Sequence, residues 1–257
     1  MDKRLQGKTI LITGASLRVL QPGGVKLVLT ARRLDVLEQI AADLAAQFPN
    51  TKVLPVQLDV SSSAAVRSFV GSLPAAFQEI DVLVNNAGLV RGVDKAPAIK
   101  EEDLDVRFAN NIHGLIHMTQ AVLPRMLARN GGAGAGDIVN IGSIAGREPY
   151  VGGGIYCATK AAVRSFTESL RKELTATRVR VIGVDPGQVE TEFSIVRFYG
   201  DKAKADAVYA GCDPLTPEDV AESIVFAVGR RENVVVADTL LFPNHQASAT
   251  IMHRRSA

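Results

Sequence analysis

Short apolar segments alternate along the whole chain with stretches of helical spacing, and this alternation constrains the fold more than any other sequence feature. Apolar runs without a polar face are typical of strands buried on both sides of a parallel sheet. We expect seven such strands, at 9–12, 26–30, 53–59, 80–85, 137–141, 179–184 and 234–237. Because strands alternate with helices, we predict an α/β fold: a doubly wound, mostly parallel seven-stranded sheet with helices on both faces.

Five segments have the spacing of amphipathic helices. They are 34–48, 61–74, 104–129, 155–176 and 216–228. The last begins with Thr-Pro-Glu-Asp, which is a capping pattern. Pro124 should kink the long helix at 104–129 or lie near its end.

The composition is that of a globular protein with one large core. Of the 257 residues, 47% are hydrophobic and 22% charged, and no linker-like stretch divides the chain, so a single domain is expected. A formal net charge of +2 is too small for an electrostatic attraction to nucleic acid or a membrane surface, and no apolar run reaches the ~18 residues of a membrane span. Two cysteines and the lack of a recognisable leader favour a cytoplasmic location.

The residues that stand out in the sequence fall at the ends of the expected strands. They are Thr13 and Gly14, Arg32 and Arg33, Asp59, the segment 85–88, Ser143 and the segment 186–187. Ligands of open α/β sheets bind at the carboxyl ends of the strands, so we expect the functional site there.

Tyr156 and Lys160 are the strongest candidates for a reaction centre. A spacing of four places both side chains on one face of the helix at 155–176. A free tyrosine has a pKa near ~10, and a nearby ammonium favours its ionised form, so Lys160 is placed to lower the pKa of Tyr156. The alternative is that they are ordinary helix neighbours without chemistry.

Six motifs follow one another along the chain. They are Thr-Gly-Ala-Ser (13–16), Asn-Asn-Ala-Gly (85–88), Asn111, Ser143, Tyr156-x-x-x-Lys160 and Asp-Pro-Gly-x-Val-x-Thr (185–191). In this order and spacing the chain resembles the short-chain dehydrogenase/reductase family over nearly its whole length. It is most similar to the branch of NADP-dependent 3-hydroxy acid (serine 3-) dehydrogenases, through segments 31–33, 141–146 and 190–198. The resemblance implies one Rossmann-type domain over 1–257, with a cofactor half at about 1–142 and a catalytic and substrate half at about 143–257.

The resemblance also implies the chemistry, an oxidoreductase acting on a small hydroxy acid or alcohol. Tyr156 would protonate a carbonyl oxygen during hydride transfer and act as base in the reverse direction. Lys160 would lower the tyrosine pKa and bind the nicotinamide ribose. Ser143 would hold the substrate oxygen, and Asn111 would carry a water-linked proton relay. Purely structural roles are the alternatives for Ser143, Asn111 and Lys160.

Charge indicates the cofactor. At the end of the second strand, Arg32 and Arg33 suit a ribose 2′-phosphate, whereas an acidic residue would suit a free 2′-hydroxyl, so NADP is expected. With the resemblance, the cofactor residues are Thr13, Gly14, Ser16, Arg32, Arg33, Asp59, Val60, Asn86, Ala87, Gly88, Tyr156, Lys160, Pro186, Gly187, Val189 and Thr191. Arg197 lies in the expected substrate loop, where it is a candidate partner for a substrate carboxylate.

The phosphate loop departs from the family pattern. The family's Thr-Gly-x-x-x-Gly-x-Gly places glycine backbone against the pyrophosphate at a helix N-terminus, but here 13–16 runs into Leu-Arg-Val-Leu-Gln-Pro-Gly-Gly (17–24). Roughly seven to ten residues are missing against that pattern. We therefore expect a first crossover helix shortened to at most 15–21, a sheet face partly uncovered beside the first strand, and weakened or absent NADP binding. A splice variant or an imperfect gene prediction would explain the gap.

A catalytically silent Rossmann-type protein that acts as an oligomer partner is the main alternative, because of the altered phosphate loop. His113 and His117 have helical spacing but no accompanying carboxylate motif, so no metal site is expected. The segment 142–146 differs from a hydrolase G-x-S-x-G elbow in the position of its serine. The resemblance implies a homo-oligomer, a tetramer by family habit, with 242–245 and 247–252 as candidate interface segments.

Overall fold

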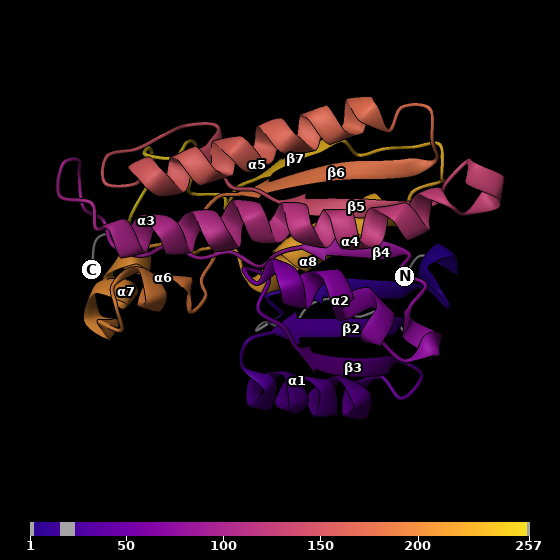
Figure 1. Ribbon diagram of the computed structural model, residues 1–257. Coiled ribbons are helices and arrows are strands. Elements are labelled where there is room, and N and C mark those ends of the chain that lie inside the picture. The colour runs from indigo at the N-terminus through magenta and orange to yellow at the C-terminus, as the bar shows by residue number, and fades with distance from the viewer. Residues whose placement is uncertain (1–2, 16–23, 256–257) are drawn as a thin grey trace.

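A single seven-stranded sheet forms the centre of the computed structural model, which describes residues 3–15 and 24–255 (Figure 1). The strand order is β3-β2-β1-β4-β5-β6-β7, and every neighbouring pair is parallel. The strands are β1 (Thr9–Thr13), β2 (Lys26–Ala31), β3 (Lys52–Gln57), β4 (Val82–Asn85), β5 (Gly136–Ile141), β6 (Val179–Pro186) and β7 (Asp238–Leu241). The predicted α/β fold with a parallel sheet is confirmed.

Eight α-helices accompany the sheet in the described part of the chain. They are α1 (Leu34–Gln47), α2 (Ser63–Ser72), α3 (Glu101–Phe108), α4 (Leu115–Leu127), α5 (Gly154–Glu173), α6 (Phe193–Arg197), α7 (Lys202–Tyr209) and α8 (Pro217–Val228). Shorter turns are η1 (Lys3–Leu5), η2 (Ala75–Phe77), η3 (Ala109–Gly114), η4 (Asn130–Gly132) and η5 (Ile144–Gly146). None of the described helices is long and apolar enough to cross a membrane.

The helices cover both faces of the sheet, as predicted. On one face, side chains of α1 and α8 pack on alternate residues of the central strands in one buried cluster. On the other face, α2, α4 and α5 pack on the remaining strand residues in a second cluster, and Figure 1 shows these three helices in front of the sheet. This alternation of inward-facing residues is what a parallel sheet buried on both sides requires.

The helix predicted at 104–129 is divided by a π-helical turn, η3, which separates α3 from α4. Gly114 ends this turn, and a Cβ there would lie 2.6 Å from the Val60 side chain, so only glycine lets the helix approach so closely. π-Turns occur often at functional sites, and this one contains Asn110 and Asn111. Pro124 lies inside α4, within its last turn.

The predicted position of the seventh strand was wrong. Residues 234–237 are not a strand, and β7 begins at Asp238, opposite Gly183 of β6. The Val234 carbonyl accepts instead from the guanidinium of Arg180, Nη1 to O 2.9 Å, so this valine run forms the approach to the strand. The capped helix at 216–228 is confirmed as α8, because Thr216 and Asp219 form a reciprocal capping box.

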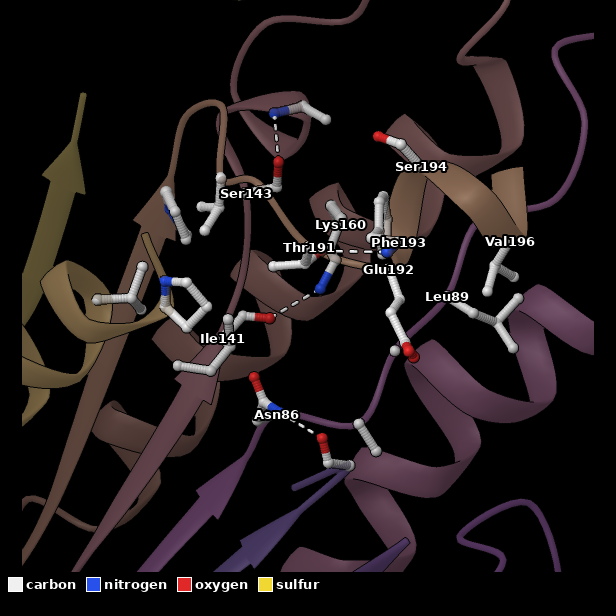
Figure 2. A pocket seen from close by; sticks show the side chains of 18 of the residues that line it. Asn86, Leu89, Ile141, Ser143, Lys160, Thr191, Glu192, Phe193, Ser194 and Val196 are labelled. Carbon is white, nitrogen blue, oxygen red and sulfur yellow. Dashed lines mark hydrogen bonds between the residues drawn. The ribbon is translucent and has the colours of Figure 1, made fainter. Parts of the chain in front are cut away.

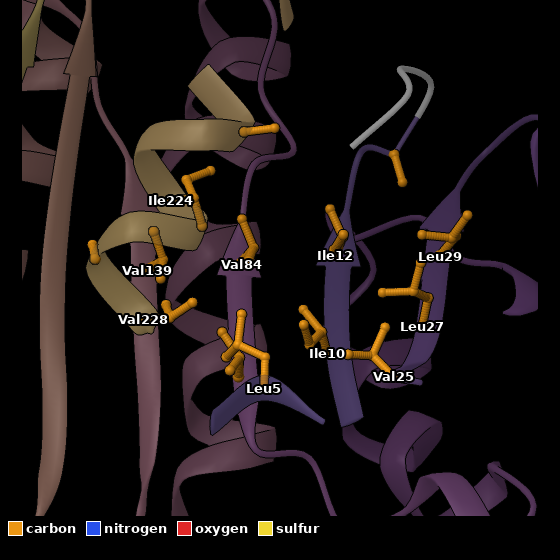
Figure 3. Close-up of a cluster of buried hydrophobic side chains, with 14 of the residues drawn as sticks. Leu5, Ile10, Ile12, Val25, Leu27, Leu29, Val84, Val139, Ile224 and Val228 are labelled. Atoms are coloured by element: carbon orange, nitrogen blue, oxygen red, sulfur yellow. The ribbon is translucent and has the colours of Figure 1, made fainter. Parts of the chain in front are cut away.

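The expectation of a shortened first helix at 15–21 concerns mainly residues 16–23, which lie outside the described residues together with the candidate Ser16. The expectation of an uncovered sheet face is wrong for the strands on either side. Ile10, Ile12 and Leu27 are fully buried, and they belong to one packed cluster with Leu5 of η1, Val25 and residues of α1 and α8 (Figure 3).

Candidate active site

A cavity of about 800 Å³ lies at the carboxyl ends of the strands, where the sequence predicts the site (Figure 2). Most of the predicted site residues line it: Gly14, Arg32, Arg33, Asp59, Val60, Asn86, Ala87, Gly88, Ser143, Tyr156, Lys160, Pro186, Gly187, Val189, Thr191 and Arg197. Thr13 and Asn111 are each only 1% exposed and are buried outside the lining. Residues of α6 cover one side of the cavity.

Thr13 and Asn86 join the ends of β1 and β4. The Thr13 hydroxyl accepts from the backbone N–H groups of Asn86 (3.1 Å) and Ala87 (3.0 Å). In return, the Asn86 amide donates to the carbonyl oxygens of Thr13 and Gly14, each at 3.0 Å. Gly14 has a φ of +63°, and a Cβ there would lie 2.6 Å from the Ala87 Cα, so glycine is required for this junction.

Tyr156 and Lys160 lie on the first two turns of α5 and both face the cavity. The Lys160 ammonium donates to the carbonyl oxygen of Ile141 (2.8 Å) and lies 5.9 Å from the centre of the Tyr156 ring. Phe193 of α6 packs edge-on against that ring, with centroids 5.5 Å apart. Tyr156 and Lys160 therefore lie on one face of α5, as their spacing predicts.

Burial dominates the electrostatics of this pair. It raises the pKa of Tyr156, the nearby Tyr150 raises it further, and a side-chain hydrogen bond with Ser143 and the charge of Arg197 oppose the rise. Burial also lowers the pKa of Lys160 to about 8, against the opposing effect of Asp185. The expected lowering of the tyrosine pKa by Lys160 is not among the main influences, because the buried environment outweighs it.

Asn111 holds the backbone that follows β4. Its side-chain oxygen accepts from the Leu89 N–H (2.8 Å), and its amide nitrogen donates to the Leu89 carbonyl (2.9 Å) and to the Thr159 hydroxyl (3.1 Å). A Cβ on Gly88 would lie 3.4 Å from the Asn111 side-chain oxygen and 3.7 Å from the Lys160 ammonium, so the two groups flank the same glycine. The three hydrogen bonds give Asn111 a positioning role in the structure.

Asp185 and Arg147 hold the Ser143 loop by hydrogen bonds. The sequence did not single them out as site residues. The Asp185 carboxylate accepts from the Ser143 N–H (3.1 Å) and from Arg147 Nε (2.7 Å). Arg147 also bonds to Asp238. Asp185 is 5% exposed, and an acidic residue at the end of a buried apolar strand is the sequence signal that could have indicated it.

Arg197 reaches into the cavity from α6. One of its terminal nitrogens donates to the Tyr150 hydroxyl (3.0 Å), and its guanidinium carbon lies 5.7 Å from the centre of the Phe193 ring. Its Nε is buried without a hydrogen-bond partner in the described part of the chain. Phe193 thus lies between Tyr156 and Arg197, and Tyr150 is a further site residue that the sequence did not indicate.

Arg33 forms an ion pair across the cavity with Glu192, at 2.6 Å between Nη2 and Oε2. Glu192 immediately precedes α6, and Figure 2 shows its side chain extending from this loop into the pocket. Both side chains are about half exposed, at 52% and 59%. The sequence predicted Arg33 as a cofactor residue but gave no indication of this partner.

No group of three or more potential metal ligands occurs among the described residues. The rings of His113 and His117, which are four positions apart, lie with their centroids 6.2 Å apart.

Comparison with known proteins identifies close relatives. Residues 8–198 match the family model described as short chain dehydrogenase. The chain is 51% identical to the NADP-dependent 3-hydroxy acid dehydrogenase of Schizosaccharomyces pombe over 262 aligned positions, which cover 99% of each chain. It is 41% identical to the NADP-dependent 3-hydroxy acid dehydrogenase YdfG of Salmonella typhi, over 96% of this chain and 99% of that one.

A solved structure agrees with these matches. The closed form of a serine dehydrogenase complexed with NADP+ has a TM-score of 0.85 to the structure at 39% identity, over 96% of this chain and 100% of that chain.

Proposed function

The chain belongs to the short-chain dehydrogenase family, and we propose that it is an NADP-dependent oxidoreductase that interconverts a small hydroxy acid or alcohol and its carbonyl form. The observation that carries the proposal is the convergence of Tyr156, Ser143 and Lys160 on one cavity at the strand ends. The relatives named NADP-dependent 3-hydroxy acid dehydrogenase support a 3-hydroxy acid as the substrate class.

The described residues fit NADP by their chemistry. Arg32 and Arg33 stand at the end of β2, where an acidic residue would select a free ribose hydroxyl, and both line the cavity. The volume of about 800 Å³ lies in the range of ligand pockets. Arg32 and Arg33 would hold the 2′-phosphate, Asp59 and Asn86 the adenosine, and Lys160 and Thr191 the nicotinamide end. When bound, the nicotinamide supplies or accepts a hydride.

Tyr156 would transfer the proton. It would give its proton to a substrate carbonyl oxygen and take it back in the oxidation direction. Because burial raises its pKa, the phenol keeps its proton at neutral pH but releases it less readily than a free tyrosine. The transfer therefore depends on groups that oppose this rise, which are the Ser143 hydrogen bond and the charge of Arg197. Ser143 shares a hydrogen bond with Tyr156 and would hold the same substrate oxygen. Lys160 would hold the nicotinamide ribose, and its charge is not among the main influences on the Tyr156 pKa.

Arg197 would bind the substrate carboxylate. Its guanidinium lies in the cavity lining, and its Nε is buried without a hydrogen-bond partner in the described part of the chain. Because its side chain bonds to the neutral Tyr150 hydroxyl, its charge is available to a ligand. A substrate carboxylate on the side of Phe193 away from Tyr156 would accept hydrogen bonds from the Arg197 guanidinium.

A second candidate function is a catalytically impaired or silent chain, favoured by the sequence at 13–24. The aligned length with the Schizosaccharomyces pombe relative, 262 positions, exceeds the 257 residues of this chain, so that relative has at least five residues that this chain lacks. If they belong to the phosphate loop, the loss weakens cofactor binding without altering the described acid-base residues.

One experiment separates the two candidates. NADPH fluorescence is titrated with this chain and with a variant whose glycine-rich phosphate loop is restored. Binding by both chains supports the active enzyme, whereas binding by the restored chain alone supports the impaired protein. For a chain that turns over, Tyr156→Phe should lower kcat by about 10²–10⁴-fold and leave the NADPH dissociation constant within about twofold. An unchanged kcat would contradict the role of Tyr156.

We also propose a cytoplasmic, single-domain homo-oligomer, a tetramer by family resemblance. Large apolar side chains are exposed on α8, β7 and the C-terminal segment: Phe226 at 55%, Leu240 at 40% and Ile251 at 66%. Sedimentation equilibrium tests the assembly, and a monomer at micromolar concentration would contradict it.

A further inference from the structure

Glu192 forms an ion pair with Arg33, the arginine that would bind the 2′-phosphate of NADP. The Glu192 carboxylate lies 2.6 Å from Arg33 Nη2, and both residues line the cavity. Arg33 stands at the end of β2 on the cofactor side, whereas Glu192 belongs to the loop that leads into α6 on the substrate side. The ion pair therefore connects the two sides of the pocket.

A phosphate would replace the carboxylate on Arg33. The pair is exposed to water at 52% and 59%, and exposed ion pairs stabilise a protein only weakly. A ribose 2′-phosphate presents more negative charge and can accept two parallel hydrogen bonds from a guanidinium. Its arrival beside an unmoved Glu192 would place like charges together, so Glu192 has to leave Arg33.

We propose that Glu192 is an internal competitor of the NADP 2′-phosphate for Arg33 and so reduces the preference of the chain for phosphorylated over unphosphorylated cofactor. This inference rests on the proposed use of NADP. Exchange of the carboxylate for the phosphate also frees the residues before α6, which carries Phe193 and Arg197. Cofactor binding is thereby linked to the placement of the substrate loop.

The test compares cofactor affinities of the unaltered chain and Glu192→Gln by fluorescence titration with NADPH and NADH at low ionic strength. Glu192→Gln should bind NADPH about threefold to fivefold more tightly, the range expected when an exposed ion pair no longer competes, and should bind NADH unchanged. High salt should reduce the difference. Equal NADPH affinity of the two chains, or an equal gain for NADH, would overturn the proposal.

Two further variants separate competition from simple charge repulsion. Glu190→Gln removes the same charge from the same loop, and Glu190 forms no ion pair in the described part of the chain, so this control should leave NADPH affinity nearly unchanged. In an Arg33→Gln background, Glu192→Gln should gain clearly less than in the unaltered chain. An equal gain in both backgrounds would show that Glu192 does not act through Arg33.

Failure of the proposed NADP-dependent function can be told apart from failure of the Glu192 competition. If the unaltered chain binds neither dinucleotide, the proposed function fails for this chain, and adenosine 2′,5′-bisphosphate then serves as the probe by titration calorimetry. Tighter binding of this probe by Glu192→Gln than by the unaltered chain supports the competition. No binding by Glu192→Gln, or equal binding by both chains, refutes it.

Discussion

Gly14→Ala is a substitution whose cost can be worked out from the junction of β1 with the segment after β4. Gly14 has a φ of +63°, which costs an L-residue roughly 1–2 kcal/mol. An added Cβ would lie 2.6 Å from the Cα and 3.0 Å from the nitrogen of Ala87. Both are backbone atoms and cannot rotate away, so overpacking adds about 1–3 kcal/mol. The expected loss of unfolding free energy is about 2–5 kcal/mol.

Gly7→Ala is the matched control for this substitution. Gly7 has a φ of +78°, but a Cβ there would meet no heavy atom within 4 Å, so only the backbone strain of about 1–2 kcal/mol applies. In a protein of this size a loss of 1 kcal/mol lowers Tm by about 2–4 °C. By calorimetry, Gly14→Ala should therefore lower Tm by about 2–12 °C more than Gly7→Ala.

The same substitution should affect the cofactor. The clash lies where Thr13 and Asn86 bind each other, so relief of the clash displaces cavity-lining residues. NADPH affinity, measured by fluorescence, should fall on the order of tenfold in Gly14→Ala and stay unchanged in Gly7→Ala. Equal Tm values and equal affinities for the two variants would refute the idea that this close approach shapes the site.

Three other substitutions test separate parts of the site and its support. Asp185→Asn removes the charge that opposes the burial effect on the Lys160 pKa, so this pKa should fall below about 8. The alkaline limb of the pH profile of kcat/KM for carbonyl reduction should then move to lower pH. An unmoved limb would contradict this role of Asp185. Arg197→Met should raise KM for a hydroxy acid about tenfold or more but not KM for a neutral alcohol; an unchanged KM for the acid would exclude the carboxylate role. Arg180→Met breaks a buried ion pair with Asp137, which has two contacts of 2.6 Å. The free energy of unfolding in urea should fall by about 3–5 kcal/mol. An unshifted urea midpoint would contradict this.

The strands and the location of the cavity could be predicted from the sequence, because both follow from local patterns. Apolar runs such as the one that became β1 define buried strands without reference to the rest of the chain. Once the strands are placed, the rule that ligands bind at their carboxyl ends brings Gly14, Arg33 and Ser143 together. Proximity within one helix likewise brought Tyr156 and Lys160 to one face.

The parts that sequence reasoning missed depend on contacts between distant segments. The valine run at 234–237 has strand propensity, but a guanidinium from β6 takes the Val234 carbonyl and the ladder starts later. The π-turn that divides the long helix ends at Gly114, which lies against Val60 of a distant segment. Glu192 and Arg33 are 159 positions apart in the chain, so no local pattern relates them.

The acid-base residues and the expected cofactor-phosphate residues belong to different elements of the fold, so cofactor binding and proton transfer can be altered separately. Tyr156 and Lys160 are fixed by α5, by the Ile141 carbonyl and by Phe193, whereas Arg33 and Gly14 stand at the ends of β2 and β1, on either side of residues 16–23. The described contacts of the acid-base residues come from β5 and α6. An altered phosphate loop is therefore expected to act on cofactor affinity, and a chain saturated with cofactor would retain the proton-transfer geometry that α5 provides.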